Sequence, residues 1–246
     1  MVKKHLKRLA IPKSWDIRKK KNKFTTRPMP GAHSFELGIP LNLVIRDLLK
    51  YAKNNHEVKK ILNNKEILVD GKIRKDYRFI TGFMDSISIP KLKKNYRVIL
   101  NKKGKLFLLA TTEQEAKIKI CKIIGKKLVK GKTQLNLFDS RNVLVEKDNN
   151  KVGDSVVIEL PTQKIKEHLK LEKGASIFVM GGKKIGTLCL VEDIINRKII
   201  CKHNNTIFEV PFDYIFVVGK NKPLIKLEKE KWMLWEIWEL RKLPLT

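Results

Sequence analysis

The sequence has 246 residues, of which 54 are Lys or Arg and 25 are Asp or Glu, so its formal net charge is +29. Hydrophobic residues make up 42% of the chain, which is enough for a packed core in one large domain or several small ones. A charge excess of this size repels itself unless a polyanion neutralises it, so nucleic acid is the predicted partner. A membrane is the rival partner, but the sequence has no apolar run of 18 residues and no signal-peptide core, so we expect a cytoplasmic protein.

Residues 1–37 form a basic arm, with eleven Lys or Arg against Asp16 and Glu36. Such a segment has too few apolar residues for a core, so we predict that it is disordered in the free protein and orders on its partner. A solvated tail is the alternative. Apolar residues such as Trp15 and Phe24 lie between the charges, however, and an arm along RNA would use its cations for phosphates and its aromatic rings for stacking.

Two helices and a hairpin are predicted between residues 40 and 90. The stretch "PLNLVIRDLLKYAKN" places its apolar residues on one helical stripe, and a second helix begins at Asn54 with Glu57 in the position of a capping box. Asp70-Gly71 between two β-prone runs is typical of a tight hairpin. Basic residues of the second helix and of the hairpin are expected on one edge, where they would meet a phosphate backbone.

Strands dominate from residue 97 onward. The pattern predicts a hairpin over 97–111, a helical turn opened by Thr112 with Glu115, and paired strands over 118–145. A further strand ends at Pro161, "QKIKEHLK" is predicted as a short helix, and residues 174–219 have the strand spacing of a small barrel. The sequence has no strand-helix-strand alternation that is long enough for a parallel sheet. We therefore expect a multi-domain, strand-rich α+β fold.

The motifs of enzymes and metal sites are missing or misplaced. "GKKLVKGKT" has five residues between its glycines, whereas a phosphate-binding loop needs four. The three cysteines are scattered, so buried thiols are favoured over a disulfide framework or a zinc site. The histidines are not spaced as metal ligands, and Asp139 and Asp193 are acids without an evident partner. We expect no cofactor, no bound metal and no small-molecule substrate.

Three segments resemble one known family in order and spacing. "HLKRLAIPKSW" followed by "RPMPGAH" is similar to the N-terminal signature of the archaeal and eukaryotic small-subunit ribosomal protein family S-four-e. "EVKKILNNKEILVDGKIRKDYRF" and "GFMDSISI" resemble the S-four-type RNA-binding fold, and "KGASIFVMGGKKIG" resembles a KOW motif with Gly186 as its turn glycine. The resemblance spans residues 3–226. It departs from the family pattern at Lys184, where Asn is expected.

The resemblance implies five parts and a non-enzymatic function. The expected parts are a basic arm (1–37), an S-four-type RNA-binding module (38–92), a central β-rich domain (93–170), a KOW-type β-barrel (171–225) and a Trp-rich helix or tail (226–246). The implied function is that of a structural component of the small ribosomal subunit, which binds ribosomal RNA and neighbouring ribosomal proteins. The alternative is a free RNA-binding protein, either an RNA-modification enzyme or a KOW-containing transcription or translation factor.

The predicted RNA-binding residues are cations of the arm, the module and the KOW turn, together with two His and one Trp of the arm. They are Lys3, Lys4, His5, Lys7, Arg8, Lys13, Trp15, Arg18, Lys19, Lys20, Lys21, Arg27, His33, Arg46, Lys59, Lys60, Lys72, Arg74, Lys75, Lys183 and Lys184. For the tail, three hypotheses stay open. It packs on the protein itself, docks on a neighbouring protein through its Trp residues, or stacks one Trp on RNA.

Overall fold

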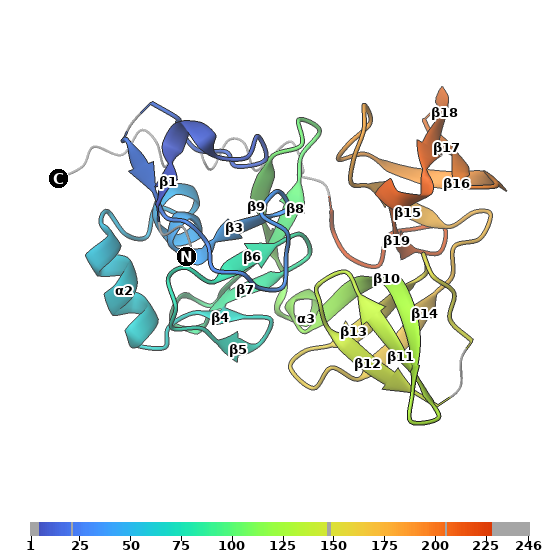
Figure 1. Cartoon of the computed structure of the whole chain (residues 1–246), viewed down its shortest axis with the longest axis horizontal. Helices are drawn as coiled ribbons and strands as arrows, with labels where there is room; N and C mark the ends of the chain where they lie inside the picture. The colour runs from blue at the N-terminus through green and yellow to red at the C-terminus, as the bar shows by residue number, and fades with distance from the viewer. Residues whose placement is uncertain (1–4, 21, 147–148, 205, 228–246) are drawn as a thin grey trace.

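The computed structural model describes residues 5–20, 22–146, 149–204 and 206–227, and over these residues the chain is a strand-rich α+β protein (Figure 1). Its strands form three five-stranded antiparallel sheets and two strand pairs in the described part of the chain. The arm and the first sheet make up one side of the molecule, and the second and third sheets make up the other. No described helix is long and apolar enough to span a bilayer. The tail hypotheses concern residues 228–246, which lie outside the described residues.

The first sheet has the strand order β5-β4-β7-β8-β9. Its strands are β4 (Leu68–Val69), β5 (Lys72–Ile73), β7 (Ser86–Ile89), β8 (Lys94–Leu100) and β9 (Leu106–Thr111). The predicted hairpin at Asp70-Gly71 is confirmed, because β4 pairs with β5 and both turn residues have positive φ, +51° and +72°. A two-residue turn of this kind requires positive φ at both positions, which Asp tolerates and Gly adopts freely.

The two predicted helices are present in altered form. The first consists of α1 (Leu41–Leu43) and one π-helical turn, η2 (Val44–Leu48), so it is shorter than predicted. Lys50 stops it with a φ of +59°. The second, α2 (Asn55–Asn63), begins after Asn54 as predicted, but the Asn54 side chain makes no capping hydrogen bond. Glu57 instead accepts a hydrogen bond from the backbone N–H of Lys53 at 2.7 Å.

The second sheet has the order β12-β11-β10-β13-β14. It comprises β10 (Ile118–Val129), β11 (Lys132–Leu137), β12 (Asn142–Val145), β13 (Ser155–Glu159) and β14 (Ile165–Leu169). The helical turn before it is confirmed as α3 (Glu113–Ala116), with the Thr112 hydroxyl accepting from the N–H of Glu115. The helix predicted for "QKIKEHLK" is wrong. This segment is the edge strand β14, because pairing with β13 and a 2.8 Å contact from His168 to Asp154 outweigh its local helical pattern.

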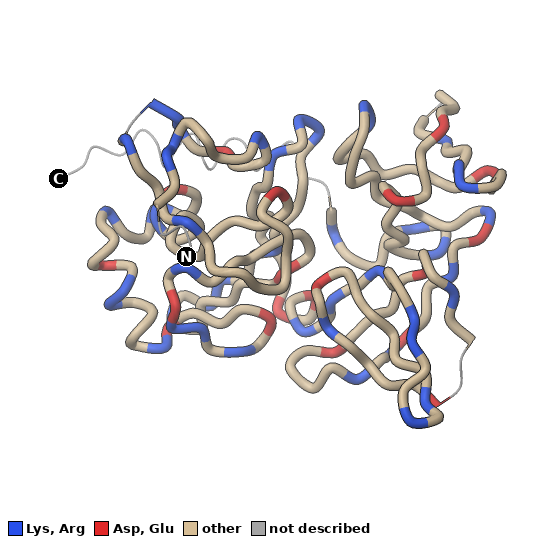
Figure 2. Tube along the Cα trace, in the orientation of Figure 1, with Lys and Arg blue, Asp and Glu red and all other residues tan. Residues whose placement is uncertain are grey.

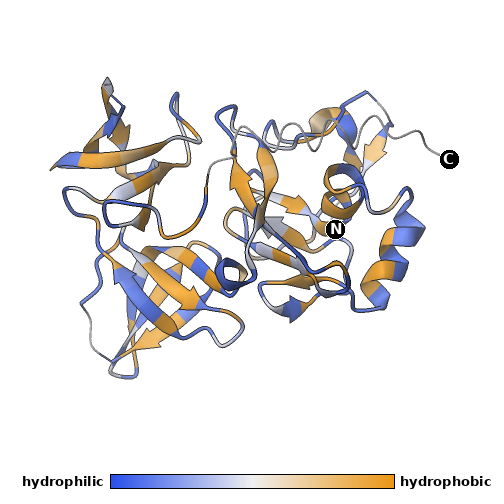
Figure 3. Cartoon of the chain, turned by 180° about the vertical axis from the view of Figure 1, so that it is seen from behind, coloured by the Kyte–Doolittle hydropathy of each residue, from blue (hydrophilic) through white to orange (hydrophobic). Residues whose placement is uncertain are grey.

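The third sheet has the order β18-β17-β16-β15-β19. Its strands are β15 (Ser176–Val179), β16 (Leu188–Ile195), β17 (Lys198–His203), β18 (Thr206–Pro211) and β19 (Ile215–Gly219). Strands carry most of the hydrophobic positions of the molecule, as Figure 3 shows from behind. The prediction of buried thiols is confirmed, since all three cysteines are free and buried.

The expected disorder of the basic arm is wrong for its described residues. β1 (Leu6–Lys7) pairs with β2 (Phe24–Thr25), and the arm lies against the first sheet. Trp15 is only 2% exposed, and its indole N–H donates to the carbonyl of Gly38 at 2.8 Å. The backbone N–H of Leu106 donates to the carbonyl of Ser14 at 2.7 Å. The arm therefore uses the core of the first sheet in place of a core of its own.

Aromatic rings join the three sheets at their common boundary. Phe83 precedes β7, Phe138 follows β11, and Phe178 and Phe216 come from the third sheet. Phe83 stacks on Phe178 with 5.3 Å between ring centroids and meets Phe216 edge-on at 5.2 Å. Phe138 stands edge-on to both Phe83 and Phe216. Ring contacts of this kind stabilise a core beyond the apolar area that they bury. The first and third sheets and part of the second share one hydrophobic cluster, while a separate cluster that includes Ile123 and Leu135 lies within the second sheet.

A buried ionic cluster lies beside these rings. The Lys119 ammonium of β10 is 1% exposed and lies 2.7 Å from Asp70, 2.5 Å from Asp85 and 3.0 Å from Asp139. His33 of the arm contacts Asp85 at 2.9 Å. Burial opposes ionisation, yet the three carboxylates raise the pKa of Lys119 well above its ordinary value. Against the same burial cost, His33 and Lys119 hold the pKa of Asp85 far below its usual range.

A second buried lysine joins the second and third sheets. Lys122 of β10 donates to the backbone carbonyls of Phe212 at 3.0 Å and Asp213 at 3.1 Å. Burial lowers the pKa of Lys122 to about 8, and Asp213 only partly offsets this shift. Arg97 is fully buried as well, and its guanidinium reaches the carbonyls of Met84 and Ile118 at 3.2 and 2.8 Å.

Replacing Lys119 with Met should lower the free energy of unfolding by about 3–5 kcal/mol, because it removes the cation that contacts all three buried carboxylates and leaves Arg141 to compensate Asp70 and Asp139. Urea unfolding measures this loss. Lys117→Met is the matched control, because Lys117 is exposed and its pair with Glu113 lies at the surface. The control should change stability by less than about 0.5 kcal/mol. An equal, small loss in both variants would contradict a structural role for the cluster.

The cluster also predicts the pH dependence of stability. The pKa values of Asp85 and Asp139 are lowered from 3.8, so their contribution is present above that pH and is lost as pH falls through the lower folded values. The pKa of Lys119 is raised above 10.5, so its contribution is lost only as pH rises further. In Lys119→Met, the destabilisation should shrink as pH falls toward about 4, because protonation removes the uncompensated charge.

Trp15→Ala should cost about 3–5 kcal/mol, as expected for removing a buried aromatic side chain. It should also open the arm to trypsin at Lys13 and Lys19, which gel analysis of timed digests would show. Leu9→Ala is the control, since Leu9 is 69% exposed in the same arm. An arm that is cleaved at the same rate in the native protein and in Trp15→Ala would show that Trp15 does not anchor it.

Candidate nucleic-acid interface

Two adjoining polar cavities lie where the arm meets the start of α2. One, of about 400 Å³, is lined by Arg27, Arg46 and Arg78 together with Phe24 and Tyr77. The other, of about 260 Å³, shares Asn22, Arg46 and Asn55 with it and adds Arg8, Asp47, Lys53 and Asn54. We call the two together the arginine cleft. Asp47 is the one acidic residue in its lining, so the cleft has a strong cationic excess.

Local structure positions the guanidinium groups of the cleft. The π-helical turn presents Arg46, which contacts Asp47 at 2.8 Å and donates to the side-chain oxygen of Asn55. Arg78, just before β6 (Ile80–Gly82), donates through Nε to the carbonyl of Arg27 at 3.0 Å. Arg78 is thus held by a neutral backbone acceptor, and no carboxylate of the described residues forms an ion pair with it. A guanidinium in this state suits a bidentate contact with a phosphate.

The N-terminus of α2 adds to the positive potential of the cleft. Asn54 and Asn55 line it, and the Asn54 side chain leaves the first-turn N–H groups without a side-chain cap. Backbone N–H groups and the helix dipole at such a terminus favour an anion. The exposed face of α2 carries Lys59, whose ammonium lies 4.9 Å from the ring centre of Tyr77, a residue of the cleft wall.

Of the cations predicted to bind RNA, some line the arginine cleft and others lie elsewhere on the surface. Most described ones are exposed or half-buried, and Figure 2 shows Lys and Arg along every part of the molecule. Arg27 and Arg46 come together in the arginine cleft. Lys60, Lys72 and Lys75 are exposed, whereas Arg74 is half-buried with its guanidinium 4.4 Å from the ring centre of Phe79. Lys3, Lys4 and Lys21 lie outside the described residues. RNA contact by this set stays a prediction.

Three predicted RNA-binding residues are buried, and the assignment of two of them, Trp15 and His33, is corrected. Arg8 is 2% exposed and donates through Nε to the carbonyl of Arg18, but it also lines the smaller cavity of the arginine cleft, so its contact with RNA stays a prediction. The Trp15 side chain is buried between the arm and the first sheet, so its ring cannot stack on a base. His33 is 7% exposed and serves the ionic cluster through Asp85. All three were assigned from an arm assumed to have no core, and docking on the first sheet buries their side chains.

The predicted turn glycine and its lysines lie between β15 and β16. Lys183 and Lys184 are exposed there, and the Lys184 ammonium lies 5.4 Å from the ring centre of Phe208. Gly186 has a φ of +75°, and a Cβ at this position would come within 2.4 Å of the backbone carbonyl of Asn101. This turn therefore packs against the β8–β9 loop. It needs glycine because of its positive φ and because a side chain would clash with Asn101.

Sequence reasoning missed Arg78, Asn22 and Tyr77 as cleft residues. Arg78 stands in "DYRF", next to the hairpin whose cations were singled out, so its charge was visible. Its position opposite Arg27 depends on the arm folding back, which no local pattern indicates. The two acids without an evident partner both have one: Asp139 contacts Lys119, and Asp193 lies 3.0 Å from Lys173. Among the described residues, no group of three His, Cys, Asp or Glu could hold a metal ion.

Comparison with known proteins identifies the class. The chain matches the model of Ribosomal family S4e over residues 92–165 and that of the RS4NT (NUC023) domain over residues 2–36. It is also similar to a crystal structure of the 30S ribosomal protein S4e from Thermoplasma acidophilum. The TM-score is 0.67 and the identity 28%, over 75% of this chain and 96% of that one. These matches define a strand-rich ribosomal protein of the small subunit.

Full-length relatives make the assignment specific. Small ribosomal subunit protein eS4 of Methanocaldococcus jannaschii is 40% identical over 240 residues, covering 92% of this chain and 98% of the relative. The protein of the same name from Methanocella arvoryzae is 42% identical over 231 residues, covering 90% and 97%. The chain belongs to the S4e family of small ribosomal subunit proteins. It is a structural ribosomal protein and not an enzyme, which confirms the expected family and class.

Proposed function

We propose that this protein binds ribosomal RNA in the small subunit and holds RNA segments in position through backbone phosphates. The observation that carries the proposal is the arginine cleft, where four arginines and the start of α2 converge with a single acid in the lining. Neutralising phosphates with such groups releases counterions, which supplies affinity without reading sequence. Aromatic rings of Phe24 and Tyr77 in the same wall add a surface on which a base can stack.

The docked arm gives this binding its geometry. Arg27 comes from the arm, Arg46 from the π-helical turn and Arg78 from the segment before β6, so a phosphate in the cleft would contact three separate parts of the chain. Cations fixed before binding lose less conformational entropy than those of a mobile tail. We infer that the arm acts as part of a preformed surface, and that its exposed cations, Lys19 and Lys20 among them, extend that surface along the RNA backbone.

The five expected parts remain a proposal, and one boundary cuts through a sheet: β8 and β9, which fall within 93–170, belong to the first sheet together with β7 of 38–92. We propose that residues 38–92 act as the S-four-type module, 93–170 as the central β-rich domain and 171–225 as the KOW-type barrel, with Lys183 and Lys184 offered to RNA by the Gly186 turn. Neighbouring ribosomal proteins are the proposed second class of partner. The place of action is the small ribosomal subunit in the cytoplasm. None of the relatives supports the alternative of a free RNA-modification enzyme or factor.

Arg46→Gln and Arg78→Gln should each lower affinity for small-subunit ribosomal RNA by about tenfold, since a hydrogen bond to a charged group contributes about 1.5–3 kcal/mol. Filter binding over a salt series measures this, and each variant should reduce the salt slope by about 0.7–0.9. The control is Arg197→Gln, because Arg197 is exposed in the turn between β16 and β17. Equal losses in all three variants would mean that net charge, and not the cleft, determines binding.

The native protein should co-sediment with small subunits in a sucrose gradient and be released only at high salt, because its contacts with RNA are mainly ionic. Reversing Lys59 and Lys72 to Glu should shift release to lower salt while leaving the melting temperature of the free protein unchanged. A protein that sediments only as a free species in cell extracts would support the alternative function.

A further inference from the structure

The outward face of β16, β17 and β18 differs from the rest of this basic surface. Residues paired directly across an antiparallel sheet lie on the same face. One row across the three strands is Leu190, Lys202 and Ile207, and the next is Asp193, Ile200 and Glu209. We call these six residues the neutral patch. Ile207 is 62% exposed and Leu190 is 41% exposed.

Every charge of the neutral patch is already paired. Glu209 lies 3.1 Å from Lys198, Asp193 lies 3.0 Å from Lys173, and Lys202 lies 3.3 Å from Glu192. A phosphate approaching the six patch residues would meet two carboxylates and one lysine, Lys202, which already pairs with Glu192. In a chain with 54 Lys or Arg against 25 acids, such local balance disfavours RNA as the occupant. An exposed isoleucine gains more from an apolar partner.

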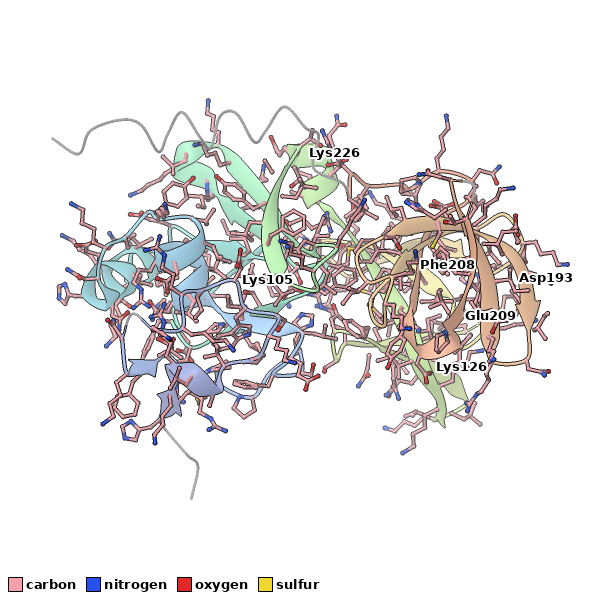
Figure 4. All side chains as sticks on the ribbon, turned by 90° about the horizontal axis from the view of Figure 1, so that it is seen from above. Lys105, Lys126, Asp193, Phe208, Glu209 and Lys226 are labelled. Atoms are coloured by element: carbon pink, nitrogen blue, oxygen red, sulfur yellow. The ribbon has the colours of Figure 1, made fainter. Side chains whose placement is uncertain are left out.

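The edge of the sheet beside the patch is also open. β18 is the last strand in the sheet order, and no described strand pairs with its outer side. Proteins commonly protect such an edge with charged residues, especially Lys, and with Pro; β18 reads Thr-Ile-Phe-Glu-Val-Pro, so it has Glu209 and the terminal Pro211 but no Lys or Arg. Strands β16 to β18 lie at the end of the molecule away from α2 in Figure 1, and Figure 4 shows Asp193, Phe208 and Glu209 at that same end.

We propose that the β18 edge and the neutral patch bind an extended segment of a neighbouring small-subunit protein by strand addition. The partner strand would satisfy the outer backbone groups of β18 and place the side chains of every second residue beside Ile207 and Glu209, with an apolar one next to Ile207. A largely uncharged, β-branched segment fits this surface. This inference rests on the proposed function, because it places the protein in the subunit, and it assigns to the third sheet a protein contact in addition to the RNA contacts.

Site-specific crosslinking in assembled subunits tests the occupant. p-Benzoylphenylalanine replaces Ile207 in the full-length chain, subunits are irradiated, and nuclease and protease digests are analysed by mass spectrometry. We expect a peptide of another ribosomal protein on Ile207. An RNA adduct, a peptide from residues 228–246 of the same chain, a peptide from a second copy, or no protein crosslink would each overturn the proposal.

The same probe at Lys59 separates this proposal from the proposed function. It should give an RNA adduct, and failure there would count against RNA binding by α2 while leaving the Ile207 result interpretable. Two added lysines form a second test. Ile207→Lys should lower retention of the protein in salt-washed subunits several-fold, whereas Thr206→Lys, with its side chain on the opposite face, should not. If the patch faced RNA, Ile207→Lys would instead increase retention.

Discussion

The ammonium group of Lys119 contacts three carboxylates that come from different parts of the chain. Asp70 and Asp85 belong to turns of the first sheet, and Asp139 lies between β11 and β12 of the second. Arg141 contacts Asp70 and Asp139, while His33 of the arm contacts Asp85 from a further side. Burying one of these charges alone would cost several kcal/mol, so the arrangement is stable only when all partners are in place. The cluster therefore specifies one orientation of the two sheets and the arm. Lys122 extends the constraint to the third sheet through the carbonyls of Phe212 and Asp213.

The cationic surface depends on this interior. Because His33 and Trp15 hold the arm on the first sheet, Arg27 lies opposite Arg46 and Arg78 rather than at the end of a loose chain. Repulsion among these guanidinium groups opposes their approach, and core packing offsets it. A surface assembled in this way is destabilised by its own charge in the free protein and stabilised when phosphates bind, which is a linkage between assembly and stability.

Local chemistry made part of the fold predictable from the sequence. The Asp70-Gly71 hairpin and the Thr112 cap each depend on two or three adjacent residues, and both are present. The β14 segment has helix-forming residues but becomes a strand because β13 offers it an edge, which no local pattern reveals. We predicted a disordered arm because of its charge, although the sequence also shows the apolar residues that pack the arm onto the first sheet. Of the candidate site, Arg27 and Arg46 were predicted, whereas Arg78 needed the three-dimensional arrangement.

The distribution of charge separates the two kinds of contact that we propose for this protein. The arginine cleft lies beside α2, and the neutral patch lies at the opposite end of the molecule (Figures 1 and 4). Interactions between exposed charges are largely screened beyond about 8 Å at physiological ionic strength, so RNA held at the cleft exerts little force on a partner at β18. The ion pairs of the patch are also local interactions, since Lys198 and Lys202 each have an acidic partner within 4 Å. Binding free energies at the two ends should then add with little coupling, because no group is shared between them. A basic chain can in this way hold RNA at one end while it presents to a protein, at the other end, a surface on which its own excess charge is already balanced.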